Sequence, residues 1–298
     1  MEINMTTRKR VSLFKTDGWK RFRKNRLALV GTTLILIMIA AAILAPFITQ
    51  NDPYVSLKGP TGSILKNVSP WDSGTILGTD SVGRDEFSRL VYAAQVSLSV
   101  GLVSVGIATL VGVLLGAIAG YFGGVADSIL MRTVDVVNCF PVMFLIIIIA
   151  TILKPSIYNI MIIMGLVNWT ATARLVRGEI LRVREMEYVQ ATISLGASSG
   201  RVIFSHVIPN VVAPIIVEAT LQMAHAILTE ASLSYLGVGV QLPTASWGNM
   251  LMDANNLATL TTRPWQWIPA GLCILLAVLS INFIGDGLRD AFDVKQKK

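Results

Sequence analysis

Residues 187–210 read E-Y-V-Q-A-T-I-S-L-G-A-S-S-G-R-V-I-F-S-H-V-I-P-N and form a short polar segment in a chain otherwise dominated by apolar runs. On one side of this segment, residues 155–173 contain no Asp, Glu, Lys or Arg. On the other side, residues 207–229 contain only one such residue, Glu218. A membrane-spanning helix needs about 20 mostly apolar residues. Each flanking run can therefore hold one, and the polar segment is predicted to connect two membrane helices.

The composition of the whole chain agrees with a membrane protein. Hydrophobic residues make up 53% and charged residues 14% of the sequence, whereas soluble domains usually carry about 25% charged residues. We therefore predict an all-α integral membrane protein with six transmembrane helices. The apolar runs that can hold them lie at about 27–48, 95–119, 136–153, 157–173, 207–229 and 267–285.

The distribution of positive charge predicts the orientation of these helices. With a cytoplasmic N-terminus and six spans, 19 of the 25 Lys and Arg residues lie inside. Six lie outside, namely Lys58, Lys66, Arg84, Arg89, Lys154 and Arg263. This asymmetry follows the positive-inside rule. The net charge of +7 is thus explained by topology rather than by nucleic-acid binding, and both termini are predicted to be cytoplasmic.

The predicted organisation has five parts. They are a basic cytoplasmic segment (1–26), a first transmembrane helix (27–48), an extracytoplasmic loop (49–92), a five-helix transport core (93–286) and a cytoplasmic tail (287–298). Near the end of the loop, Asp80 or Ser81 is predicted to cap a short helix on the outer surface. In the core, glycines spaced four apart at 112, 116 and 120 predict close helix packing, because small residues let helices approach each other in lipid.

The inner segment of the core, residues 174–206, contains the polar segment quoted above. Apolar residues recur at three- and four-residue spacing over 174–195, which predicts an amphipathic helix. Gly196 should end it, since glycine adopts positive φ without steric cost. Ser198 or Ser199 can then cap a second helix, leading into the next span. The result would be a helical hairpin whose tip, rich in small residues, can enter a groove on another protein; an ordinary loop held against lipid headgroups by its arginines is the alternative.

The spacing inside this segment resembles a loop of ABC importer permeases, with the pattern E-A-A, three residues, G, nine residues, I-x-L-P. The matching positions here are Gln190-Ala191-Thr192, Gly196 and His206-Val207-Ile208-Pro209. Both spacings, the glycine and the proline agree, while Gln190, Thr192, His206 and Ile208 depart from the pattern. The resemblance implies an ATPase-coupling loop that includes Glu187, Gln190, Ala191, Thr192, Gly196, Ala197, Ser198, His206 and Pro209.

A narrower resemblance extends over most of the chain, to the second permease subunit of peptide/nickel ABC importers. The similar segments are K-N-R-L-A-L-V-G (24–31), L-G-T-D (77–80), G-R-D (83–85), G-Y (120–121), G-G (123–124), M-R (131–132), L-T-E-A-S-L-S-Y-L-G (228–237), S-W-G (246–248) and G-D-G-L-R-D (285–290). The resemblance implies a type I importer fold in the cytoplasmic membrane of a prokaryote. It also implies a second homologous permease subunit, two cytoplasmic ATPase subunits and an extracytoplasmic binding protein as partners.

The sequence offers no nucleotide site of its own. It contains no G-x-x-x-x-G-K-[ST] phosphate loop and no H-E-x-x-H pair. Only two histidines are present, which disfavours a metal centre built from imidazoles. We therefore expect no catalytic residue, no metal site and no cofactor bound by this chain. ATP and Mg would be held by the partner ATPases, whose closure would draw the two permease loops together and produce alternating access.

Polar residues inside the fifth span are candidates for a translocation path. Glu218, Gln222 and His225 share one helix face, because their offsets are four and seven. Ionisable residues at membrane depth are costly and usually face a bundle interior or a water-filled cavity. Asn138, Asn168 and Asn282 are further candidates in other spans. A polar contact that only joins span 5 to a neighbouring helix would explain the same stripe.

Peptide import is the function that these patterns favour most. The same machine importing nickel or another small solute is the nearest alternative. A secondary transporter or channel would work without an ATPase, and it would leave residues 187–210 unexplained. An intramembrane enzyme would need a catalytic constellation that the sequence does not display.

Overall fold

The computed structural model describes residues 17–153 and 156–292, whose regular elements are all helices, with no β-strand. Most of the predicted basic segment, the turn at 154–155 and the end of the predicted tail lie outside these ranges. Five described helices are long and apolar enough to cross a membrane. They are α2 (Arg26–Ile43), α4 (Glu86–Phe122), α7–α8 (Ile157–Val167 and Trp169–Arg184), α10–α11 (Ser199–Val202 and Ile208–Tyr235) and α14 (Ile268–Phe292). The all-α prediction is confirmed.

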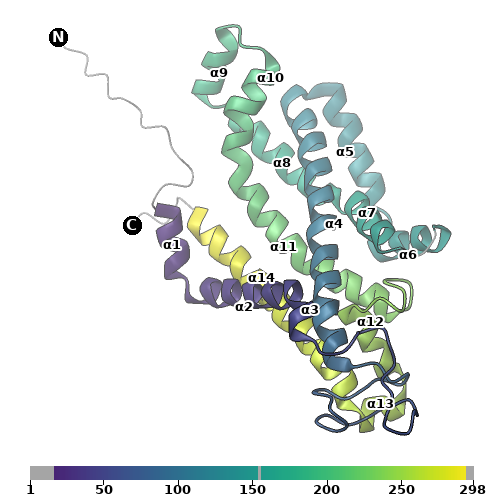
Figure 1. Ribbon diagram of the computed structural model, residues 1–298. Coiled ribbons are helices and arrows are strands. Elements are labelled where there is room, and N and C mark those ends of the chain that lie inside the picture. Colours follow the sequence, from purple (N-terminus) through teal and green to yellow (C-terminus); the bar gives the residue numbers. More distant parts are fainter. Residues whose placement is uncertain (1–16, 154–155, 293–298) are drawn as a thin grey trace.

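The helices place the two large polar parts of the chain at opposite ends of the molecule (Figure 1). At one end, called here the α9 end, α9 (Glu187–Ser194) and α10 form a hairpin. At the other, the α13 end, residues 49–85 pack near α12 (Trp247–Leu251) and α13 (Leu257–Thr262). The long helix α4 runs between the two ends, and α8 and α11 pack against it. The candidate coupling loop and the predicted outer loop are therefore separated by the helical bundle.

Small residues bring α4 and α8 into close contact, as the glycine spacing predicted. A Cβ atom on Gly116 would lie 2.5 Å from the carbonyl oxygen of Ala173, and one on Gly112 would lie 2.8 Å from that of Trp169. Real side chains do not fit at these distances. Glycine at these positions therefore lets the two helix backbones touch.

The predicted third span, 136–153, is not one straight helix. Helix α5 (Gly124–Asn138) ends before α6 (Val142–Ile152) begins, and the two are bent by 83°. Pro141 explains the break, because proline lacks the backbone N–H and disfavours a helical conformation in the residue before it. The pair forms either one broken span or a re-entrant loop, which gives the described residues five or six membrane-crossing elements.

The predicted amphipathic helix over 174–195 is also divided. Helix α8 continues from the fourth span to Arg184, and α9 begins after a turn at 185–186. Val183 and Val189 both pack in one buried cluster. In a straight helix these two side chains would point about 120° apart, and the turn at 185–186 lets both face the same cluster.

At the α13 end, the predicted cap and surface helix are wrong. Asp85, not Asp80 or Ser81, caps the next helix by accepting a hydrogen bond from the Ser88 backbone N–H (2.9 Å). That helix is α4 itself, 37 residues long and continuous with the second span. No separate surface helix precedes it within the described residues of the outer loop.

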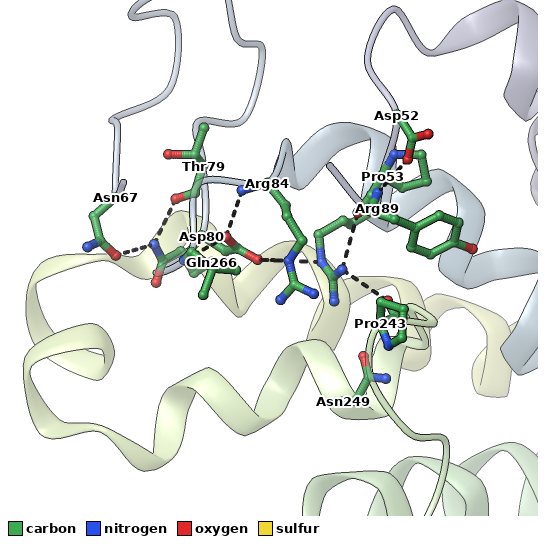
Figure 2. A network of polar contacts seen from close by, with 12 residues as sticks. Asp52, Pro53, Asn67, Thr79, Asp80, Arg84, Arg89, Pro243, Asn249 and Gln266 are labelled. Atoms are coloured by element: carbon green, nitrogen blue, oxygen red, sulfur yellow. Dashed lines mark hydrogen bonds and ion pairs between the residues drawn. The ribbon is translucent and has the colours of Figure 1, made fainter. Parts of the chain in front are cut away.

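Asp80 instead lies at the centre of a buried polar network (Figure 2). Its Oδ2 atom is 2.6 Å from Arg84 Nε and 3.8 Å from Arg89 Nε. Arg89 Nη1 also donates to the carbonyl oxygens of Pro53 (3.3 Å) and Pro243 (3.4 Å). One arginine on α4 thus holds the 49–85 segment against the loop that precedes α12.

A second contact of this network joins the 49–85 segment to the 3₁₀ turn Pro264–Gln266. Gln266 Nε2 donates to the Thr79 carbonyl oxygen (2.8 Å) and to Asn67 Oδ1 (3.0 Å). Burial raises the pKa of Asp253 nearby, and the Asp80 carboxylate raises it further. The α13 end is therefore a folded cap built from two chain segments rather than a pair of separate loops.

The close approach of α4 and α8 makes a testable prediction. Replacing Gly116 with Ala should destabilise the protein by about 1–3 kcal/mol, because the added methyl overpacks the contact with Ala173. Thermal unfolding in detergent measures this loss. Gly106→Ala is the matched control on the same helix, since no heavy atom lies within 4 Å of the place where its methyl would stand. Equal midpoints for both variants would contradict the packing argument.

Candidate functional site

The α9–α10 hairpin forms an exposed tip at the α9 end (Figure 1). Gly196 joins its two helices with φ +79°, and no heavy atom lies within 4 Å of the place where a Cβ would stand. The predicted positive φ is confirmed. Ser198 occupies the N-cap position of α10, but its side chain makes no capping hydrogen bond. The turn therefore depends on the backbone of Gly196 more than on a serine cap.

A compact apolar base fixes this tip to the helical bundle. Fully buried valines and one isoleucine from α8, α9, α10 and the start of α11 pack together, namely Val176, Ile180, Val183, Val189, Val202, Val207 and Val211. Leu195, in contrast, is 88% exposed at the outer surface of the tip. The hairpin is thus anchored at its base and presents an apolar side chain at its apex.

The other predicted coupling residues surround this apex or follow it. Glu187, Gln190 and Ala191 are exposed on α9, Thr192 and Ala197 are partly exposed, and Ser198 is exposed. The polar ones are engaged locally: Gln190 Nε2 donates to the Arg184 carbonyl oxygen (2.9 Å), and Thr192 Oγ1 donates to that of Tyr188 (2.7 Å). These bonds hold α9 in shape and leave its outer face available.

His206 and Pro209 lie where the tip passes into α11. His206 is in a π-helical turn, Ile203–Val207, and its carbonyl oxygen accepts a hydrogen bond from Asn210 Nδ2 (2.5 Å). Pro209 follows this π turn as the second residue of α11 and, like Pro214 further along the helix, has no N–H to donate. The chain nevertheless stays helical from α10 into α11. No loop separates the tip from this long membrane helix.

Three arginines of α8 bind other parts of this chain. Arg177 forms two hydrogen bonds with Asp127 of α5, at 2.5 and 2.6 Å. Arg184 Nη1 donates to the carbonyl oxygen of Tyr121 at the end of α4 (2.8 Å). Arg174 Nη2 donates one hydrogen bond to Asp135 Oδ1 of α5 (2.6 Å). Anchoring to lipid headgroups is therefore not needed to explain these charges, because they fasten α8 to α4 and α5.

A second feature is a polar cavity of about 320 Å³ beside α11. Three of its lining residues are the predicted stripe on that helix, Glu218, Gln222 and His225, and Asn168 lines it from the junction of α7 and α8. Gln222 Nε2 donates to Glu218 Oε1 (2.9 Å) and to Thr172 Oγ1 (3.0 Å). The structure therefore brings four of the six predicted path residues to one cavity.

The other two predicted path residues are placed differently. Asn138 does not line the cavity, but its Oδ1 accepts a hydrogen bond from Thr170 Oγ1 (3.0 Å), and Thr170 does line it. Asn282 lies on α14 and is not among the lining residues. Sequence reasoning missed Thr229, which continues the stripe four residues after His225 and could have been found by that spacing.

The lining of this cavity suits a polar solute with a cationic group. Glu218 is the only carboxylate among the lining residues, and they include no Lys or Arg. A separate hollow of about 700 Å³ lies between α4, α11, α2 and α14, and its lining is almost entirely apolar. Thr220 of α11 faces this apolar groove, whereas His225 faces the polar cavity. The two faces of α11 thus differ sharply in polarity.

Residues 196–200 also spell G-x-S-x-G, the string found at the nucleophile elbow of α/β-hydrolases. In those enzymes the serine lies on a sharp turn between a strand and a helix. Here Ser198 lies between two helices, and no strand occurs in the described part of the chain. The structural context of a hydrolase elbow is therefore missing, and the glycine serves the hairpin turn.

Two family models match the sequence. Residues 112–298 match the family described as binding-protein-dependent transport system inner membrane component. Residues 12–63 match the N-terminal TM domain of oligopeptide transport permease C. The first match covers α5 to α14 with the tip and most of the cavity lining.

Relatives named as peptide permeases are similar over nearly the full length. The chain is 41% identical over 286 residues to the dipeptide transport system permease protein DppC of Alkalihalophilus pseudofirmus, covering 94% of this chain and 90% of the relative. It is 39% identical over 293 residues to the oligopeptide transport system permease protein OppC of Bacillus subtilis, covering 98% and 93%. It is 39% identical over 287 residues to the di/tripeptide transport system permease protein DppC of Pseudomonas aeruginosa, covering 94% and 92%.

The two faces of α11 predict different chemical accessibility in the membrane. In a background where Cys139 and Cys273 are replaced by Ala, a cysteine at position 225 should react several-fold faster with a water-soluble maleimide than a cysteine at position 220. The polar cavity admits water, whereas the apolar groove stays dry. Labelling rates measured by mass spectrometry on membranes provide the comparison. Equal rates would show that the cavity is not hydrated.

Proposed function

The chain belongs to the family of binding-protein-dependent transport system inner membrane components and has the type I fold of ABC permeases, and on this premise we propose that it is the membrane subunit of an ATP-driven peptide importer. The observation that carries the proposal is the exposed α9–α10 tip, anchored at its base and continuous with α11. Such a tip can receive force from another subunit and pass it to a helix that lines a polar cavity.

Peptides are the proposed cargo. The relatives described above are named for dipeptides, oligopeptides and di/tripeptides. The cavity lining agrees with such a cargo, since Glu218 can bind the amino group of a peptide while Asn168 and Gln222 can hydrogen-bond its amide groups. The proposed path includes the stripe Glu218, Gln222 and His225 together with Asn168.

The proposed machine contains four kinds of subunit. A second, homologous permease completes the membrane part, and two cytoplasmic ATPases bind ATP and Mg. An extracytoplasmic binding protein delivers the peptide to the α13 end. The tip residues from Glu187 to Ser198 would dock on an ATPase. Closure of the ATPases would then draw the two permease tips together and open the path outward, and ATP hydrolysis would reset it.

This arrangement places the α9 end and both termini in the cytoplasm. Helix α1 (Asp17–Lys24) packs against α14, and Asn25 Nδ2 donates to Asp290 Oδ2 (3.2 Å) near the last described residues. The start and the end of the described chain thus lie together. The excess of Lys and Arg at this side supports a cytoplasmic location by the positive-inside rule.

Docking of the tip is tested by changing its bulk. Gly196→Trp should abolish co-purification of the ATPase subunits and peptide uptake, because a large side chain at the apex blocks entry into a groove. Gly196→Ala is the matched control: it carries a similar strain at φ +79°, about 1 kcal/mol, but adds little bulk, and it should retain association. Normal association and uptake in the Trp variant would count decisively against the coupling role.

The proposed path is tested by transport assays on two variants of the stripe. Glu218→Gln should lower peptide uptake at low substrate concentration by about tenfold, since losing one charged hydrogen bond costs about 1.5–3 kcal/mol, and His225→Ala should also lower uptake because it removes a polar group from the cavity. Thr220→Val, on the opposite face of α11, should leave uptake unchanged. Unaltered uptake and unaltered peptide preference in both stripe variants would show that the peptide does not pass through this cavity.

A further inference from the structure

Glu230 is a fully buried carboxylate near the α13 end of α11. Its Oε1 accepts a hydrogen bond from Ser234 Oγ (2.7 Å), and its Oε2 accepts one from Ser97 Oγ of α4 (3.0 Å). The hydroxyl of Ser246, which precedes α12, also bonds to it. Three segments of the chain therefore place a serine around one carboxylate. We call this group the serine cradle: Ser97, Ser234 and Ser246 around Glu230.

The hydrogen bonds of the cradle have a fixed direction. Each hydroxyl also accepts a backbone N–H from the segment 236–250: Trp247 N to Ser97 (3.2 Å), Val240 N to Ser234 (2.9 Å) and Asn249 N to Ser246 (3.2 Å). A serine hydroxyl has a single proton. Because its lone pairs receive the backbone N–H, that proton is free to point at Glu230. The cradle thus offers the Glu230 carboxyl group three hydroxyl donors.

The cradle fastens the 236–250 segment to two membrane helices at once. Burying a carboxyl group is costly unless hydrogen bonds satisfy it, so Glu230 is fully satisfied only when the segment, α4 and α11 are all in place. Backbone packing beside the cradle is equally close. A Cβ atom on Gly248 would lie 2.5 Å from Ala231 Cα, and one on Gly239 would collide with the Ser234 hydroxyl.

The position of Glu230 connects the other functional features. On the same helix, Thr229 and His225 line the polar cavity, and α11 leads back to the tip at its opposite end. On the outer side, the 236–250 segment contains Pro243, whose carbonyl oxygen binds Arg89 of the buried network (Figure 2). A continuous set of contacts therefore runs from the folded cap at the α13 end through Glu230 into α11.

We infer that Glu230 is a positioning residue that transmits movement of the outer cap to α11, so that docking of the binding protein at the α13 end changes the cavity and the tip. The inference rests on the proposed function, because it assigns the signal to the binding protein and the response to the ATPases. Glu230 does not contact the cargo; it acts through the 236–250 segment and through α11.

The test uses the complete transporter in lipid vesicles, with the ratio of ATP hydrolysis with and without peptide-loaded binding protein as readout. In Glu230→Gln an N–H₂ group replaces one acceptor oxygen and faces a hydroxyl that also donates. We expect the stimulation ratio to fall by about tenfold, because a buried donor of the cradle loses its acceptor. Basal hydrolysis and subunit assembly should stay as in the wild type. A general loss of stability would instead lower all three.

Ser232→Ala is the matched control, because Ser232 lies two residues away on α11 and its hydroxyl donates only to the Leu228 carbonyl oxygen within the helix. It should leave the stimulation ratio unchanged. If Glu230→Gln fails to assemble, Ser97→Ala removes the α4 donor alone and should still lower the ratio, while the control does not.

A wild-type ratio in Glu230→Gln, or in Ser97→Ala where that variant is used, overturns the inference. An equal loss in Ser232→Ala also overturns it, since the cradle would then have no special role. The proposed function is tested on the wild-type complex. If that complex shows neither peptide uptake nor any stimulation by the binding protein, the proposed function is wrong and the inference that rests on it falls as well.

Discussion

Backbone continuity from the α9–α10 tip into α11 is the constraint on which the functional features depend. This segment, Ser199–Tyr235, is helical over about 55 Å, although a π turn and the prolines at 209 and 214 interrupt its regular hydrogen bonding. It carries the tip at one end, the polar stripe around Glu218 in the middle and Glu230 near the other end. In the proposed mechanism, a displacement at either end also moves the residues of α11 that line the cavity.

Helices α4, α5 and α8 are fastened to one another, and in the proposed mechanism α11 moves relative to them. Helices α4 and α8 touch through glycines, and charged pairs such as Arg177 with Asp127 fasten α8 to α5. Two buried carboxylates at the α13 end have defined partners: Asp80 has two arginines, and Glu230 has the serine cradle. Buried charges are tolerated when they are paired and hydrogen-bonded. These sites thus mark where separate segments are held in one arrangement.

Sequence reasoning succeeded where a local pattern determines the structure. Run length and charge predicted the membrane helices, the positive φ of Gly196 followed from glycine alone, and helical spacing placed Glu218 and His225 on one cavity. It failed where distant contacts decide. The turn at 185–186 is set by the burial of both flanking valines, and the network around Asp80 is completed by Pro243 and Gln266, which lie far along the chain. Periodicity reports which face of a helix is apolar; it does not report where the helix bends or what lies opposite.

In the proposed function, this chain transports peptides only as part of an ATP-driven machine. The most direct measurement is uptake of a labelled dipeptide into vesicles that contain this chain with its partner permease and ATPases. Uptake should require ATP on the side of the ATPases and the loaded binding protein on the other side, and it should stop when either is omitted. Uptake by this chain alone, or uptake driven by an ion gradient without ATP, would contradict the account.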